Sequence, residues 1–81
     1  PSDLVVRIAP EMVRYLTEAP LSKNQKILAC DDGHTLTANV KDTWQLRWWL
    51  LSQGASVEVF APIDLRQTIA KTLSQAAGLY V

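Results

Sequence analysis

The sequence predicts a small α+β domain. Short runs of apolar and β-branched residues, bounded by prolines and turn residues, are typical of strands. Between and after these runs lie stretches with apolar residues at helical spacing, one of which holds all three tryptophans. With 81 residues, of which 48% are hydrophobic, the chain is long enough for a single domain, residues 1–81, with a small core.

Prolines and turn residues divide the chain into the predicted elements. Pro10 suits the first turn of a helix, and Pro20 ends that helix because the residue before a proline avoids the helical conformation. Asp31, Asp32 and Gly33 form a typical hairpin turn. The predicted elements, in order, are a strand at 4–9, a helix from 10, strands at 26–30 and 35–40, a helix between Asp42 and Gly54, a strand at 57–60 and a helix after Asp64.

The stretch from Asp42 to Pro62 is the most informative part of the chain. Asp42 can accept hydrogen bonds from the free N–H groups of a first helical turn, and Gln45 completes the spacing of a capping box. Gly54 stands where the end of a helix needs a positive φ angle. Pro62 ends the strand that follows, because a proline cannot donate a hydrogen bond to a neighbouring strand.

The last helix completes the predicted fold. Asp64 is predicted to cap it, and Leu65, Ile69, Leu73 and Ala76 recur at helical spacing along it, so we expect one buried stripe. The order is therefore βαββαβ plus a final helix. Because crossover connections are right-handed, this order favours a ferredoxin-like sandwich with an additional C-terminal α-helix and with the first and third strands in the middle of the sheet.

The alternation along the strands assigns their side chains to two faces of the sheet. Leu36, Ala38 and Val40 are predicted to face the core, and two helices are predicted to cover that face. The opposite face is mixed, so it must be solvated, covered by the last helix or used as a contact surface. Its predicted residues are Arg7, Thr35, Thr37, Asn39, Glu58 and Phe60.

Charge and composition exclude several classes of protein. Eight basic and eight acidic side chains give a formal net charge of zero, which argues against a stand-alone nucleic-acid binder. The single cysteine, Cys30, excludes an internal disulfide and suits a reducing compartment such as the cytoplasm. No apolar run approaches the roughly 20 residues of a membrane span, so we expect no membrane association. The chain begins at Pro1, and we expect it to be a fragment of a longer chain.

Arg7 is the sharpest candidate for a binding residue. A guanidinium on a central strand can hold a phosphate or a carboxylate through two hydrogen bonds. The alternative is an ion pair with Glu58, because the fourth strand should lie next to the first. Lys26, Thr37 and Asn39 complete the predicted ligand-binding set.

The tryptophans predict an interface. Trp44, Trp48 and Leu51 are predicted to lie on the side of their helix that faces away from the sheet. Because exposed aromatic side chains usually mark an interface, we expect these residues and Phe60 to contact another protein surface. Alternatively, the C-terminal helix or a neighbouring domain of the same chain covers them.

The sequence contains no pattern that predicts catalysis, a metal or a cofactor. His34 beside the acidic turn is a weak metal motif, and a solvated turn is the simpler interpretation. Cys30 has no CxxC partner and is predicted to be a small core or sheet residue. The argument for an enzyme, an acylphosphatase-like hydrolase, rests only on the predicted topology and on Arg7 and Asn39. Because a fold does not imply a function, we expect that the chain is not an enzyme.

A series of motifs runs along nearly the whole chain. In order, they are LVVRIAPEMVRYL, a PLSKNQKI link, the DDG turn, a helix of the form L-x-x-W-L-L-x-x-G, a V-E-V-x-x-P strand, and a helix that opens with L-R and is followed by a tyrosine. In this order they strongly resemble the C-terminal extension, or WCX domain, of WYL-domain transcriptional regulators. Trp48 departs from the polar residue expected there. The matching residues in the second half are Leu46, Trp49, Leu50, Leu51, Gly54, Val57, Glu58, Val59, Pro62, Leu65, Arg66 and Tyr80.

The resemblance implies a function. Regulators of this family combine a winged helix-turn-helix that binds DNA, a WYL domain that senses a nucleic acid or nucleotide, and a ferredoxin-like C-terminal extension that helps in dimerisation and switching. By resemblance, we expect a homodimeric module that couples an effector to the DNA-binding domain of a bacterial regulator. The alternative is a regulatory domain that senses an amino-acid-like metabolite.

Overall fold

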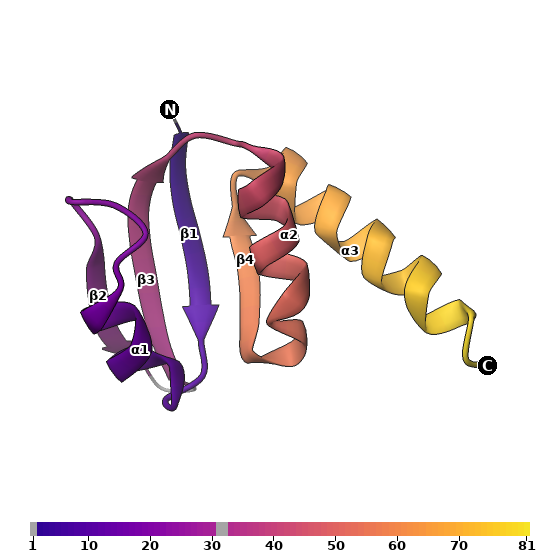
Figure 1. Cartoon of the computed structure of the whole chain (residues 1–81), viewed down its shortest axis with the longest axis horizontal. Helices are drawn as coiled ribbons and strands as arrows, with labels where there is room; N and C mark the ends of the chain where they lie inside the picture. The colour runs from indigo at the N-terminus through magenta and orange to yellow at the C-terminus, as the bar shows by residue number, and fades with distance from the viewer. Residues whose placement is uncertain (1, 31–32) are drawn as a thin grey trace.

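The computed structural model describes residues 2–30 and 33–81. Figure 1 shows a four-stranded sheet, helices packed against it, and a last helix that extends away from the rest. The α+β class predicted from the sequence is confirmed. The strands are β1 (Ser2–Ile8), β2 (Lys26–Cys30), β3 (Gly33–Val40) and β4 (Val57–Ala61), and the helices are α1 (Met12–Glu18), α2 (Trp44–Ser52) and α3 (Ile63–Gly78).

Neighbouring strands of the sheet are antiparallel throughout, in the order β2-β3-β1-β4. β1 and β3 therefore lie in the middle of the sheet, as predicted. Along this central pair Val6 lies opposite Leu36, and Arg7 lies opposite Thr35. Because residues that lie opposite each other share a face, this register sends the apolar set to one side of the sheet and the polar set to the other.

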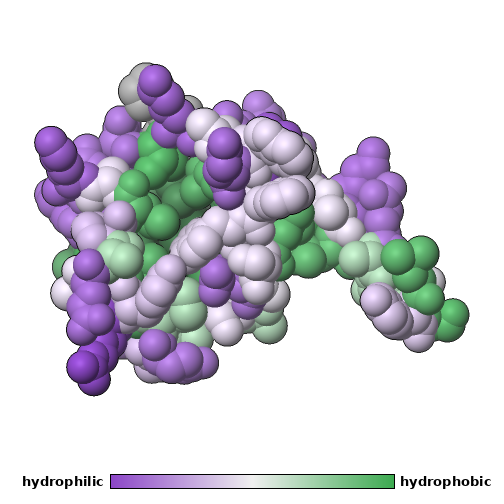
Figure 2. Space-filling model, viewed as in Figure 1, coloured by the Kyte–Doolittle hydropathy of each residue, from purple (hydrophilic) through white to green (hydrophobic). Residues whose placement is uncertain are grey.

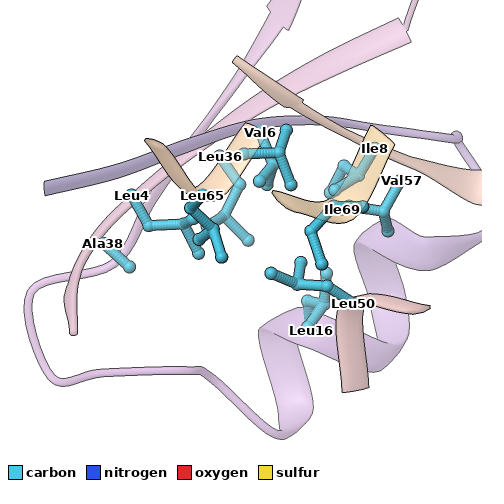
Figure 3. Close-up of a cluster of buried hydrophobic side chains, with 11 residues drawn as sticks. Leu4, Val6, Ile8, Leu16, Leu36, Ala38, Leu50, Val57, Leu65 and Ile69 are labelled. Atoms are coloured by element: carbon cyan, nitrogen blue, oxygen red, sulfur yellow. The ribbon is translucent and has the colours of Figure 1, made fainter. Parts of the chain in front are cut away.

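The core lies between one face of the sheet and all three helices. Figure 3 shows apolar side chains from strands and helices converging there. Burying a leucine such as Leu16 of α1 or Leu50 of α2 stabilises the fold by about 1.5–3 kcal/mol. The buried side chains are Leu4, Val6, Ile8, Leu16, Leu36, Ala38, Leu50, Val57, Val59, Leu65 and Ile69.

The last helix does not cover the second face of the sheet. It buries Leu65 and Ile69 in the same core that α1 and α2 close. The predicted buried stripe then stops, because Leu73 is 38% exposed and Ala76 is exposed. The helix runs away from the sheet as it proceeds, so its distal half extends beyond the body of the domain (Figure 1).

Two helix starts differ from the predicted ones. Thr43, not Asp42, caps α2, and its Oγ1 accepts a hydrogen bond at 3.2 Å from the backbone N–H three residues later. Asp42 accepts two hydrogen bonds from Arg47 instead, at 2.9 and 2.8 Å, and these hold the pKa of its carboxyl below the usual range. In α3, Pro62 occupies the cap position, and Asp64 lies in the first turn, where the helix dipole favours a carboxylate.

Two glycines take the backbone conformations that the turns require. Gly54 has a φ angle of 57°, which confirms the positive angle predicted at the end of α2. Gly33 has a φ angle of 139° and pairs with Cys30 across the hairpin. The other predicted turn residues, Asp31 and Asp32, lie outside the described residues.

Candidate interaction surfaces

The second face of the sheet carries polar and charged side chains from its two central strands. The register places Asp3, Val5 and Arg7 of β1 opposite Asn39, Thr37 and Thr35 of β3. These side chains alternate with the buried ones, so they point away from the helices. We call this surface the open face.

A charged cluster joins β1, β4 and α3. Arg7 Nε donates a hydrogen bond to Glu58 Oε1 at 3.1 Å, and Arg66 Nη1 donates one to Glu58 Oε2 at 3.3 Å. The hydrogen bond from Arg7, with the second from Arg66, holds the pKa of Glu58 below its usual range. The ion pair that the sequence left as an alternative for Arg7 therefore forms.

Arg66 was not predicted as a site residue. Its Nη1 also donates to the backbone oxygen of Val59 at 2.7 Å, which ties α3 to β4. The sequence contains a feature that could have predicted the role of Arg66 in the cluster. Pro62 reverses the chain after β4, so a basic residue one turn into the next helix comes within reach of Glu58.

A groove of about 310 Å³ opens between β4 and α3. Its charged groups are the three members of the cluster, and its remaining walls are apolar. Such a groove fits a small molecule that has both a charged group and an apolar part. The apolar lining residues are Ala55, Val57, Val59, Ile69, Ala70 and Leu73.

A second hollow, of about 320 Å³, lies at the other end of β1. Lys26, Thr37 and Asn39 from the predicted ligand set line it together with Asp3. Asn39 Nδ2 donates to Asp3 Oδ1 at 2.9 Å, so part of the amide is engaged. Arg7 lies four residues further along β1, roughly 13 Å at the rise of a strand. The structure therefore brings three of the four predicted residues together and leaves Arg7 apart.

Trp44 and Trp48 form an exposed pair on α2. Their ring centroids lie 4.7 Å apart at an interplanar angle of 67°, an edge-to-face contact. Trp44 is 63% exposed and Trp48 is 64% exposed, as predicted. Leu51, which was predicted to lie with them, is partly buried and packs against the core. Leu51 lies only about 100° around the helix from the buried Leu50, and α3 packs beside α2.

Phe60 lies in the sheet layer, apart from the tryptophan pair on α2. It is 42% exposed, and the register between β1 and β4 shifts beside it, because Val5 lies opposite Ala61 while Val6 lies opposite Val59. This irregularity interrupts the pairing near the end of β4. Its role at an interface stays a prediction.

A model of the WCX domain family matches residues 1–77. The chain belongs to the WCX domain family. The resemblance found in the sequence is thereby confirmed, and the chain is a regulatory accessory domain of the kind found in WYL-type regulators. A comparison with curated proteins finds no match. Within residues 2–30 and 33–81, the structure has no helix with the length and apolar character to cross a membrane.

One residue of this WCX domain lies elsewhere than predicted. His34 was assigned to a solvated turn, but β3 begins at Gly33, so His34 lies in the strand opposite Ile8. Its Nδ1 is buried, with no hydrogen-bond partner in the part of the chain that the structure describes. Cys30 is a sheet residue at the end of β2, which agrees with its prediction; it is exposed, and Thr35 Oγ1 donates to its Sγ at 3.6 Å.

The charged cluster predicts a pH dependence of stability. Because the pKa of Glu58 is lowered on folding, its contribution is complete above the pKa of an unfolded glutamate, about 4.3, and is lost as the pH falls through the lower folded value. We expect Glu58→Gln to lower the free energy of unfolding at neutral pH by up to about 1 kcal/mol, since solvent screens this partly exposed pair. Urea titrations at falling pH should show the two proteins converging.

Glu18→Gln is the matched control for this prediction. Glu18 pairs with Arg14 on the surface of α1, where the two side chains are 69% and 90% exposed. Its replacement should change the free energy of unfolding at neutral pH by less than about 0.5 kcal/mol. A difference between wild type and Glu58→Gln that stays constant down to strongly acidic pH would contradict the role given to Glu58.

Proposed function

We propose that this WCX domain is the dimerisation and ligand-response module of a bacterial WYL-family transcriptional regulator. In this role it couples the binding of an effector, a nucleic acid or a nucleotide, to the DNA-binding domain of the same chain. Membership of the WCX family supports the regulatory role. The net charge of zero supports contact with proteins rather than direct binding of DNA. The central position of β1 and β3 supports a ferredoxin-like fold.

The exposed pair of Trp44 and Trp48 is the observation that carries the proposed coupling to the other domains of the chain. Two indoles that leave most of their surface in water are typical of protein interfaces, where tryptophan often contributes most of the binding energy. α2 presents the pair in the helix layer, so a partner bound there leaves the open face accessible. We assign this surface to contact with the WYL or winged helix-turn-helix domain.

In this proposal the effector binds at the charged cluster beside the groove and along the adjoining open face. Arg7 and Arg66 share one carboxylate, Glu58, which leaves an excess of positive charge beside the groove. Lys26 adds positive charge at the second hollow. An effector that touches this face and the WYL domain shifts their relative arrangement only if it binds one arrangement better than the other.

We further propose that the domain binds its effector without catalysing a reaction. An acylphosphatase-like site would need Arg7 and Asn39 to act on one substrate. Arg7 is instead paired with Glu58, and Asn39 is hydrogen-bonded to Asp3 at the far end of the same strand. Their separation supports a role in binding.

The groove favours one alternative, a domain that senses an amino-acid-like metabolite. An amino acid carries a carboxylate, which suits the guanidinium of Arg7 or Arg66, and an ammonium group, which suits Glu58. The groove volume of about 310 Å³ also lies within the range of small-molecule sites.

Thermal unfolding of the chain with added ligands separates the two functions. The probes are a mononucleotide, a short single-stranded oligonucleotide and the common amino acids. A ligand at about 100 times its Kd stabilises a protein by about 2.7 kcal/mol, which raises Tm measurably. We expect a nucleotide or oligonucleotide to raise Tm, and Arg7→Ala to reduce that rise. A rise with amino acids alone would favour the alternative, and no rise with any probe would count against both.

A further inference from the structure

The two edges of the sheet are built differently. At the β4 edge, α3 follows directly after the strand, and Arg66 donates a hydrogen bond to the backbone oxygen of Val59 at 2.7 Å. The register shift beside Phe60 further disturbs the regular pairing of this strand. An edge that is occupied and irregular in this way is poorly suited to pair with another strand.

The β2 edge has none of these protections among the described residues. β2 pairs with β3 alone and lies at the outer end of the sheet (Figure 1). Four of its five residues are exposed, and Leu28 is 68% exposed. The strand reads KILAC, with one charge and no proline. One side of its backbone therefore presents N–H and C=O groups that can pair with a further strand.

We propose that a second copy of this chain pairs with this edge, β2 against β2, so that two sheets join into one. The pairing is antiparallel, with Leu28 of each copy on the two-fold axis. This inference rests on the proposed dimerisation and names the surface that makes it.

The sequence of β2 is complementary to itself in this register. Lys26 lies opposite Cys30 of the second copy, and Ile27 lies opposite its Ala29. The two Lys26 side chains are then separated by four residues along the strand, roughly 13 Å, which exceeds the screening length of about 8 Å at physiological salt. The two Leu28 side chains meet at the centre, so the exposed apolar side chain of each copy is covered by the other.

The faces of the two sheets also match. Residues that lie opposite each other in an antiparallel pair point to the same side. Leu28 lies opposite Thr35 on the open face, while Ile27 lies opposite the buried Leu36. A register centred on Leu28 therefore keeps the helices of both copies on one side, and it alone keeps all five residues paired. Such a contact is isologous and closes at two copies.

Disulfide trapping tests this register. Leu28→Cys is made with Cys30→Ser, so that each chain carries one cysteine at the expected two-fold axis. Two such Cα atoms in an antiparallel pair lie about 4.5–5.5 Å apart, within reach of a disulfide. Mild oxidation should convert most of the chains to a covalent dimer. Tyr15→Cys with Cys30→Ser is the control, because Tyr15 is 53% exposed but lies on α1. Equal trapping in both variants would overturn the proposal.

Gel filtration with light scattering gives an independent measurement. Leu28→Lys places two like charges on the axis, so we expect the Kd of the dimer to rise at least about tenfold, while Tyr15→Lys leaves it unchanged. Circular dichroism confirms that both variants fold. A wild-type chain that is monomeric at every concentration would refute the proposed dimerisation and this inference together. A dimer that survives Leu28→Lys would refute the β2 pairing alone.

Discussion

Leu65→Ala is expected to lower the free energy of unfolding by about 2–5 kcal/mol. Leu65 is 2% exposed in the core, where its removal loses apolar contacts and leaves a cavity. A domain of 81 residues has a total stability of about 4–12 kcal/mol, so this single change removes a large part of it. Urea unfolding followed by circular dichroism measures the effect.

Leu73→Ala is the matched control on the same helix. Leu73 lies two turns after Leu65 and is 38% exposed, where α3 leaves the body of the domain. Figure 2 shows that hydrophobic residues continue to the far end of this helix, where they stand clear of the body. We expect Leu73→Ala to cost less than about 1 kcal/mol. Equal costs for the two substitutions would mean that the distal half of α3 is packed in solution.

Gly33→Ala is the second substitution with a large expected effect. The φ angle of Gly33 is 139°, a conformation that residues with a side chain rarely adopt, and it costs about 1–3 kcal/mol. An added Cβ would also lie 3.0 Å from the backbone oxygen of Ile8, which belongs to the central strand β1. Because β1 is held by pairing on both sides, we expect a loss at the upper end of that range in the same urea assay.

Gly78→Ala provides the comparison for Gly33. A Cβ at Gly78 meets no atom within 4 Å, and this glycine lies in the last turn of α3. The substitution should leave stability unchanged or raise it by up to about 1 kcal/mol, because alanine restricts the unfolded chain. If Gly33→Ala and Gly78→Ala had the same effect, the close approach to β1 would be refuted.

Local patterns predicted most of the sheet. β2 has the predicted bounds, Leu36 and Ala38 are buried as predicted, and Gly54 has the predicted positive φ angle. Each of these depends on the period of two along a strand or on the freedom of one glycine, and both are properties of a few consecutive residues. The exposure of Leu28 could have been predicted in the same way, because the alternation along β2 places Leu28 on the same face as Lys26.

Helix starts were less predictable. Asp42 and Thr43 are both good caps, and the sequence offers them side by side. The guanidinium of Arg47 donates two hydrogen bonds to Asp42, and Thr43 is the residue that caps the helix. Which of two adjacent acceptors caps a helix is therefore decided by a third side chain.

The sequence by itself determined the α+β class, the family and the two faces of the sheet, because each of these follows from patterns that recur along the chain. Only the tertiary structure decided which charged groups meet. Glu58 binds Arg66 as well as Arg7 because α3 returns along β4. Lys26 and Asn39 lie together, away from Arg7, because the length of β1 separates them. These contacts join residues that are distant in the chain, and no local period specifies their distance in space.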